Sequence, residues 1–275
     1  MADQPTDARA RLLSHFQGQE PSAHGQKWDE LWIEGFLPWD KGFPSPALVD
    51  LLAERQDLLG SSTGKKLKAL VPGCGKGYDV LLLTAYGYDA YGLEISANAI
   101  DAAKKNEKEV EENAIYNPND GVSKGKVTWL VGDFFNDEFL KDVDGDGGFD
   151  LIYDYTFLSA MPLSMRAAWS KRQNELLAPE GRLVCLEFPT YKPLSTGGPP
   201  FGLPPKIYTA LLPRPGQELK YDDQGELLEA ELGPPSSKGL KQIAHFKPKR
   251  THEIGYAADG TITDWVGVWA HPNAV

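Results

Sequence analysis

The sequence of 275 residues contains little cysteine and has no long apolar run. Its two cysteines, Cys74 and Cys185, fall in or beside apolar segments of strand length, which favours buried reduced thiols over a disulfide or a metal site. No run of about eighteen apolar residues is present, so we expect no transmembrane helix and no membrane partner. The first residues also lack the basic and then apolar start of a secretory signal, which makes the cytoplasm the expected location.

Positive charge is also scarce. The 28 lysine and arginine residues are outnumbered by 39 acidic residues, so the net charge is −11. The basic side chains form one short cluster, at residues 247–250. Because binding to a phosphate backbone requires clustered cations, we expect no nucleic-acid partner.

An acidic run at residues 142–147 has the spacing of the first half of a calcium-binding loop. Position twelve of such a loop would be Tyr153 instead of a bidentate glutamate, and a strand instead of a helix follows. We therefore expect a polar surface insertion and no bound metal.

A glycine-rich turn organises the chain. An apolar strand at residues 67–71 precedes Gly73, Gly75 and Gly77, and a helical pattern begins near Tyr78. Glycine accepts a positive φ and lets a ligand lie against the backbone, and the start of the helix offers free N–H groups to an anion. A strand, glycine turn and helix in this order form the first unit of a nucleotide-binding α/β sheet.

The next strand, at residues 90–95, contains Glu94, twenty-one residues after Gly73. A carboxylate at this point accepts hydrogen bonds from the two hydroxyl groups of a ribose. The combination predicts a ligand that contains adenosine, either a dinucleotide or S-adenosylmethionine.

Strands and helices alternate through the rest of the chain. Such alternation, ending in an antiparallel hairpin of residues 250–256 with 261–270, predicts one doubly wound α/β domain. We expect this domain over residues 46–275, preceded by an N-terminal helical lid over residues 1–45. Further strands are expected at residues 127–131, 149–153 and 182–188, and helices at residues 7–16, 46–59, 97–113 and 160–177.

Two groups of residues lie where such a sheet binds its ligand. Asp133 and Phe134 follow the third strand, at the position where a carboxylate and an aromatic ring hold adenine. Asp154 and Tyr155 follow the fourth strand, at the carboxyl edge of the sheet. Asp154 is a candidate base for a neutral thiol, although it is equally suited to fixing the turn after its strand.

Three tryptophans lie within the N-terminal segment. Trp28 and Trp32 are spaced i, i+4 and share one side of a helix, and Trp39 follows the helix-ending Gly35 and Pro38. This spacing is typical of an aromatic stripe that packs on the core. It is equally typical of an aromatic lid over a cationic ligand such as a sulfonium, because cations are attracted to π faces.

At this point the chain resembles a known family, that of the thiopurine S-methyltransferases, and within it the thiol and halide methyltransferases of plants and fungi. The resemblance covers residues 28–212. It rests on the segments W-D-E-L-W-I-E-G-F-L-P-W-D, L-V-P-G-C-G-K-G-Y-D, Y-G-L-E-I-S, G-D-F-F, F-D-L-I-Y-D-Y, M-R-A-A-W and G-G-P-P-F.

The resemblance implies a class I methyltransferase fold, Rossmann-like, with a doubly wound seven-stranded sheet. It implies S-adenosylmethionine as cofactor, without a metal, and methyl transfer to a small thiol, hydrosulfide, thiocyanate or halide by a monomer. It also implies roles for single residues. The cofactor would be bordered by Trp28, Trp32 and Trp39, and bound by Gly73, Gly75, Glu94, Asp133 and Phe134. Tyr155 would lie beside the reacting methyl group, and Arg166 near the substrate.

Three alternatives stay open. A small-molecule O- or N-methyltransferase would share the fold, although the N-P-P-Y-like run of many amino methyltransferases is absent after the fourth strand. An NAD-dependent oxidoreductase would share the glycine turn and the acid, but no separate substrate domain follows. A non-catalytic protein that binds S-adenosylmethionine would retain the same motifs.

Overall fold

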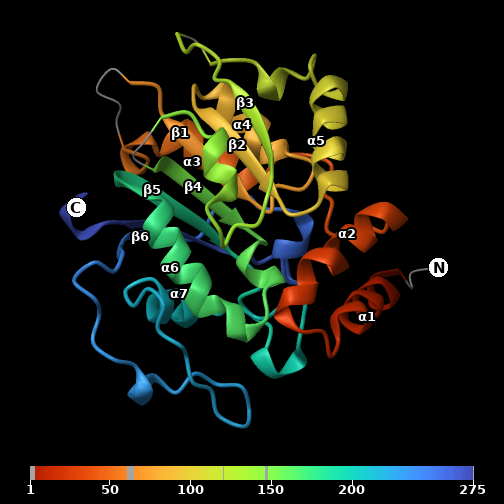
Figure 1. Cartoon of the computed structure of the whole chain (residues 1–275), viewed down its shortest axis with the longest axis vertical. Coiled ribbons are helices and arrows are strands. Elements are labelled where there is room, and N and C mark those ends of the chain that lie inside the picture. The colour runs from red at the N-terminus through yellow and green to blue at the C-terminus, as the bar shows by residue number, and fades with distance from the viewer. Residues whose placement is uncertain (1–3, 61–64, 120, 146–147, 275) are drawn as a thin grey trace.

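The computed structural model describes residues 4–60, 65–119, 121–145 and 148–274. Within these ranges, seven strands form one sheet in the order β3-β2-β1-β4-β5-β7-β6 (Figure 1). The strands are β1 (Lys68–Pro72), β2 (Asp89–Glu94), β3 (Val127–Val131), β4 (Phe149–Tyr155), β5 (Leu177–Glu187), β6 (Lys241–Phe246) and β7 (Trp265–Ala270). The helices are α1 (Gln4–Phe16), α2 (His24–Glu34), α3 (Pro46–Glu54), α4 (Tyr78–Ala85), α5 (Ala97–Glu109), α6 (Arg166–Leu176) and α7 (Pro205–Leu211).

Strands β1 to β5 run parallel, and β7 is antiparallel to both β5 and β6. The chain order reverses at β1, which pairs with β2 on one side and with β4 on the other. Glu94 and Tyr155 are the last residues of β2 and β4, and Gly73 directly follows β1. The parallel arrangement therefore brings all three to one edge of the sheet, at the reversal point where such sheets bind ligands.

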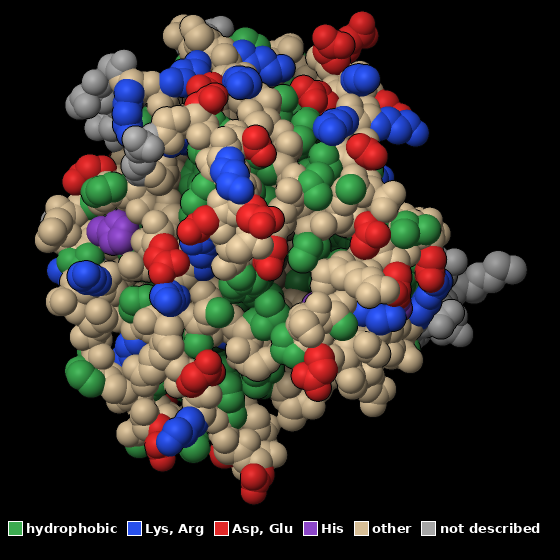
Figure 2. Space-filling view, viewed as in Figure 1, with side chains coloured by type: hydrophobic (Ala, Val, Ile, Leu, Met, Phe, Trp, Pro, Cys, Tyr) green, Lys and Arg blue, Asp and Glu red, His purple; other side chains and the backbone are tan. Residues whose placement is uncertain are grey.

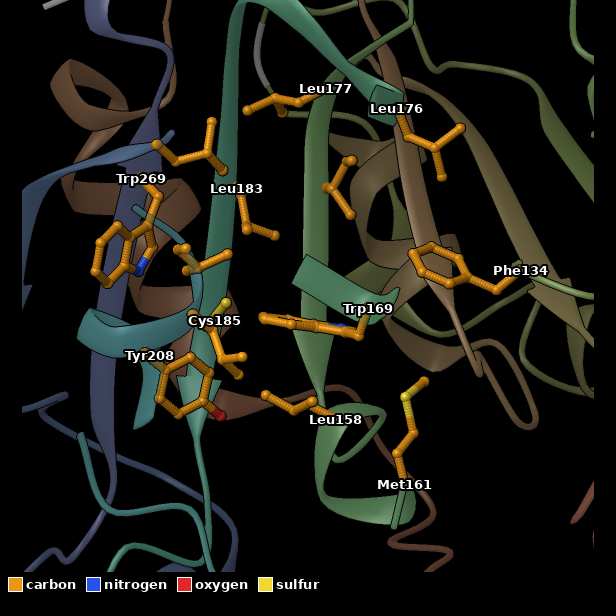
Figure 3. Packing of buried hydrophobic residues seen from close by; sticks show 14 of the residues in the cluster. Phe134, Leu158, Met161, Trp169, Leu176, Leu177, Leu183, Cys185, Tyr208 and Trp269 are labelled. Carbon is orange, nitrogen blue, oxygen red and sulfur yellow. The ribbon is translucent and has the colours of Figure 1, made fainter. Parts of the chain in front are cut away.

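One face of the sheet is covered by α6 and α7. Their buried side chains pack with residues of β5 and β7, and Trp169 of α6 is fully buried. Figure 3 shows Trp169 in the middle of this cluster, near Cys185 of β5 and Leu158. Both cysteines are free thiols, as the sequence predicts.

The other face is covered by α3 and α4, whose leucines pack against β1 and β5. Ser45 caps α3, since the backbone N–H of Leu48 donates to its Oγ, and Pro46 follows at the first helical position. Ser96 caps α5 in the same way, with Ala99 N–H 3.1 Å from its Oγ. These caps place the starts of both helices next to the carboxyl edge of the sheet.

The seven-stranded sheet and its antiparallel end are confirmed, but the expected partner of the last strand is wrong. Strand β7 pairs with β6, and residues 250–256 contribute only an isolated bridge, Tyr256 to Ile262. This segment instead leaves the sheet and packs over the loop after α2, with the rings of Phe43 and His252 4.7 Å apart.

Several element boundaries also differ from expectation, and α3 and α5 end at Glu54 and Glu109 instead of residues 59 and 113. Helix α6 begins at Arg166 instead of residue 160, because Pro162 interrupts the helical pattern and two short 3-10 turns precede it. Strand β5 includes the expected turn at residues 179–181, and its pairing with β4 shifts register there. Within the described residues, no helix is both long and apolar enough to cross a bilayer.

Candidate active site

A cleft of about 760 Å³ lies at the carboxyl edge of the parallel strands. Its walls come from the N-terminal segment, from the turns after β1 to β5, and from the C-terminal segment at Ile254. Figure 2 shows hydrophobic side chains gathered in a hollow beside the N-terminal helices. The size suits a ligand as large as a nucleoside cofactor.

The glycine turn has the backbone expected of it. Gly73, Gly75 and Gly77 all have positive φ, at 60°, 54° and 77°. Gly73 lines the cleft, and a Cβ there would lie 2.5 Å from Cδ2 of Phe157. The Gly75 N–H donates to Oε1 of Glu94 at 3.0 Å, so the turn and the acid are held together.

Glu94 faces the cleft from the end of β2. Its carboxylate accepts from the N–H groups of Gly75 and Ile95, at 3.0 and 3.2 Å. Burial raises the pKa of Glu94 to about 7, and the backbone donors partly offset this effect. The carboxylate has about four acceptor sites, so these backbone donors leave capacity for a hydroxyl group of a ligand.

Asp133 and Phe134 both line the cleft after β3. Oδ1 of Asp133 accepts from Phe135 N–H at 2.9 Å, which leaves the second carboxylate oxygen for another donor. The ring of Phe134 meets the ring of Phe157 edge to face, with centroids 5.1 Å apart. The two residues therefore form a carboxylate and an aromatic wall, as the sequence predicts.

Trp28, Trp32 and Trp39 also line the cleft. They form one aromatic cluster, in which the centroid of Trp39 lies 5.1 Å from that of Trp28 and 6.0 Å from that of Trp32. Phe16 of α1 extends the cluster, 4.6 Å from Trp28. The tryptophans thus join the N-terminal helices to the ligand edge, which fits the lid interpretation better than a stripe buried in the core of the sheet.

Two polar contacts hold this N-terminal segment on the domain. Oδ1 of Asp29 accepts from Ser96 Oγ at 2.5 Å and from Asn98 Nδ2 at 2.8 Å, at the start of α5. Asp40 pairs with Lys76 of the glycine turn, 2.5 Å away. The segment therefore contacts the start of α5 and the glycine turn that leads into α4.

Tyr155 lies in the cleft at the end of β4. Its ring stacks on His252, with centroids 5.6 Å apart, and meets Phe188 edge to face at 6.3 Å. Burial, followed by the charge of Lys41, lowers the pKa of His252 to about 4, so this histidine is neutral near pH 7. The next residue, Thr156, has a φ of 68°, a conformation that costs energy outside glycine and often occurs at functional sites.

Asp154 points to the opposite side from Tyr155 and does not belong to the described lining of the cleft. Its carboxylate accepts from Trp169 Nε1 at 2.8 Å, from Leu158 N–H at 3.2 Å and from Gln173 Nε2 at 3.3 Å. Burial raises its pKa to about 6, against the lowering effect of these donors. The contacts favour the role of fixing the turn and the α6 face over the role of a base.

Arg166 is also absent from the described cleft lining. Only 1% of its surface is exposed. Its Nη2 donates to the Gly202 carbonyl at 3.1 Å, and burial lowers its pKa. In this conformation Arg166 braces the loop that precedes α7.

Sequence reasoning missed several residues of the cleft. Lys41 follows the last tryptophan of the N-terminal segment, and Ile254 comes from the C-terminal segment, for which no pattern indicated a site. His252 of the same segment is not part of the described lining but stacks on Tyr155, which is. Among the described residues, no group of three or more His, Cys, Asp or Glu side chains is arranged to hold a metal. Residues 146–147 of the calcium-loop-like run lie outside the described ranges.

Comparison with known proteins agrees with this geometry. The sequence profile described as "Thiopurine S-methyltransferase (TPMT)" matches residues 23–243. The chain belongs to the thiopurine S-methyltransferase family. This confirms the resemblance, and the chain is an S-adenosylmethionine-dependent methyltransferase.

Individual members of the thiopurine S-methyltransferase family are similar over most of the chain. "Probable thiol methyltransferase 2" of Arabidopsis thaliana is 32% identical over 242 residues, covering 88% of this chain and 92% of the relative. "Thiocyanate methyltransferase 1" of Brassica oleracea is 31% identical over 185 residues, with 67% and 70% covered. "Thiopurine S-methyltransferase" of Legionella pneumophila (strain Corby) is 30% identical over 178 residues, with 64% and 75% covered.

A solved structure supports the fold of this family member. An S-adenosylmethionine-dependent methyltransferase from Anabaena variabilis ATCC 29413 superposes with a TM-score of 0.55 at 16% identity, over 90% of this chain and 94% of that one. The class I methyltransferase fold expected from the sequence is therefore confirmed.

Proposed function

We propose that this methyltransferase transfers a methyl group from S-adenosylmethionine to a small thiol, hydrosulfide, thiocyanate or halide ion. The proposal rests on the apolar side chains that line the cleft together with Tyr155. They include Phe188, Met161 and Met165. Thioethers and aromatic rings are polarisable and suit sulfur and iodide nucleophiles. The relatives named as thiol and thiocyanate methyltransferases support the same class.

The residues of the cleft fit the cofactor. Gly73, without a side chain, offers its backbone to the methionyl end, and the free lone pairs of Glu94 suit the ribose hydroxyl groups. Asp133 and Phe134 would hold adenine, and the three tryptophans would border the sulfonium, which their π faces attract. We therefore assign cofactor binding to this set, with Gly75 acting through its bond to Glu94.

Bound S-adenosylmethionine supplies a methyl group that its sulfonium makes electrophilic. The protein has to align the nucleophile and to exclude water. Tyr155 and Phe188 form one wall for this alignment, and the N-terminal segment of residues 1–45 acts as the lid over the domain of residues 46–275. An anion such as iodide needs no general base, which agrees with the engaged carboxylate of Asp154.

A competition assay tests this function. The protein is incubated with S-adenosylmethionine and an equimolar mixture of a small thiol, thiocyanate, a phenol and an amine, and the methylated products are separated and quantified. We expect methylated sulfur products to dominate. Predominant O- or N-methylation would assign the chain to the other small-molecule class, and an absence of turnover with all four nucleophiles would contradict the proposed substrate class. The monomeric state, the cytoplasmic location and the absence of a metal stay predictions.

A further inference from the structure

We infer that Lys41 is the anion-recognition residue of this cleft, where its ammonium group attracts a small anionic nucleophile toward Tyr155. Lys41 would then favour anions such as thiocyanate and iodide over neutral nucleophiles. The inference rests on the proposed function, because it assumes that the nucleophile binds in the cleft that Tyr155 lines.

Lys41 is placed for this role by the loop that follows α2. It lies two residues after Trp39, is half-buried and lines the cleft together with Tyr155 and Phe188. Arg9, the other lysine or arginine of the described lining, is exposed. Lys41 is therefore the sheltered cation of this part of the cleft.

The position of Lys41 relative to Tyr155 follows from His252. The charge of Lys41 acts on His252, and the His252 ring stacks directly on Tyr155 at 5.6 Å. Lys41 and Tyr155 therefore line the same cleft and share His252 as a neighbour. Phe43, two residues after Lys41, contacts the same histidine, which fixes the course of the loop.

No neighbouring acid neutralises Lys41 directly. Asp40 is engaged by Lys76 at 2.5 Å and by the N–H of Gly42 at 3.0 Å, and Glu253 is exposed. Lys41 makes no hydrogen bond or ion pair with the described residues, and the charges of Asp40 and Glu253 reach it only as longer-range attractions. Burial lowers its pKa more than these charges raise it, which indicates a poorly hydrated ammonium group.

The other charged groups of the cleft do not offer an anion the same attraction. Glu94 and Asp133 are acids, and burial lowers the pKa of His24, which keeps that ring neutral. A poorly hydrated cation beside an apolar wall favours a large, weakly hydrated anion. Once methylated, such an anion is uncharged, so the attraction acts on the substrate and not on the product.

Anion binding can be measured without turnover. The protein is saturated with S-adenosylhomocysteine and titrated with thiocyanate by calorimetry, for the wild type and for Lys41→Met, Lys41→Gln, Lys41→Arg and Lys104→Met. Lys104, an exposed lysine of α5 outside the cleft, provides the matched control. We expect Lys41→Met and Lys41→Gln to weaken thiocyanate binding about tenfold, equivalent to about 1.4 kcal/mol, and Lys41→Arg to retain most of it. Lys104→Met and the affinity for S-adenosylhomocysteine should be unchanged.

Kinetics give a second readout. The KM for thiocyanate should rise about tenfold in Lys41→Met while kcat stays the same or rises, because the anion loses its charge as it is methylated. Unchanged thiocyanate affinity and KM in both neutral variants would overturn the role of Lys41 and leave the proposed function intact. A wild-type protein that neither binds nor methylates thiocyanate, iodide or a thiol would overturn both. The two neutral variants differ in polarity, so the test does not depend on the folding of one of them.

Discussion

The imidazole ring of His252 lies parallel to the phenol ring of Tyr155, with centroids 5.6 Å apart and an interplanar angle of 9°. The two residues come from distant parts of the chain, one from the end of β4 and one from the segment before β7. Because burial holds the pKa of His252 at about 4, the stack joins two uncharged rings near pH 7. His252 therefore supports one side of Tyr155 and does not act as a base.

This stack predicts a positioning role for His252. The variant His252→Ala removes the support of Tyr155 and should lower kcat about tenfold to a hundredfold, since a shift of about 1 Å can cost about a hundredfold in rate. His252→Phe restores a flat ring and should recover most of the activity. Steady-state kinetics would measure both, and S-adenosylhomocysteine binding would confirm an intact cofactor site. A rate in His252→Phe as low as that in His252→Ala, or an activity profile in which His252 titrates near pH 6.5, would contradict the role.

Glu94 predicts a pH dependence of cofactor binding. Ribose hydroxyl groups donate to the ionised carboxylate, and its pKa in the free protein is about 7. Affinity for S-adenosylhomocysteine should therefore be full above pH 7 and fall by up to about tenfold per pH unit below it, because a proton must then be lost on binding. In Glu94→Gln the affinity should be lower by about tenfold or more at pH 8 and should lose this pH dependence. Calorimetry between pH 5.5 and about 8.5 measures it, and an equal slope in the variant would assign the titration to another group.

Asp154 should matter for stability more than for proton transfer. Asp154→Ala leaves the buried Trp169 Nε1 without its acceptor, and such a loss costs about 1–3 kcal/mol of unfolding free energy. The exposed Asp101→Ala on α5 provides a control and should change stability by less than about 0.5 kcal/mol. Urea denaturation measures both variants.

The pH profile of thiol methylation completes this test. Without a protein base, the rate should rise with pH until the pKa of the substrate thiol, about 8.5 for a cysteine-like thiol, and a more acidic thiol should move the inflection equally. Iodide methylation should be nearly flat across the neutral range. An inflection fixed across thiols, and lost in Asp154→Ala without a change in stability, would make Asp154 the base.

The N-terminal segment should respond to the cofactor as a lid. Its contacts to the domain include the bonds from Asp29 to the start of α5 and from Asp40 to Lys76, which are only partly buried. S-adenosylhomocysteine should therefore slow hydrogen exchange over residues 24–41 and leave β1 and β4 nearly unchanged. Deletion of residues 1–40 should leave a folded and inactive domain. A truncated form that turns over normally would contradict the lid.

Local pattern was sufficient to predict the centre of the site. The strand before Gly73, the glycine turn and the strand ending in Glu94 each depend on neighbouring residues, and parallel strands deliver their ends to one edge. Trp28 and Trp32 were found for the same reason, since their spacing fixes their side of a helix. These features require no knowledge of distant contacts.

The rest of the site depends on contacts between distant segments. Lys41 and His252 converge only because residues 250–256 leave the sheet and cross the loop after α2. The true partner of β7 was missed because β6 is an edge strand, half-exposed and polar, with one neighbour in the sheet. The burial of Arg166 could not be predicted because a charged residue on a polar helix carries no sign of burial, and the carbonyl of Gly202, its acceptor, is remote in sequence.

We propose that this cleft transfers a methyl group to a small soft nucleophile. The most direct measurement uses S-adenosylmethionine with a deuterated methyl group, mixed with the protein and potassium iodide in a sealed vial, and gas chromatography with mass spectrometry of the headspace. We expect deuterated iodomethane in amounts that match the S-adenosylhomocysteine formed, and about tenfold less or lower with Glu94→Ala when S-adenosylmethionine is below saturation. S-adenosylhomocysteine formation without deuterated iodomethane, and without a deuterated methyl sulfide when a thiol replaces iodide, would contradict this proposal.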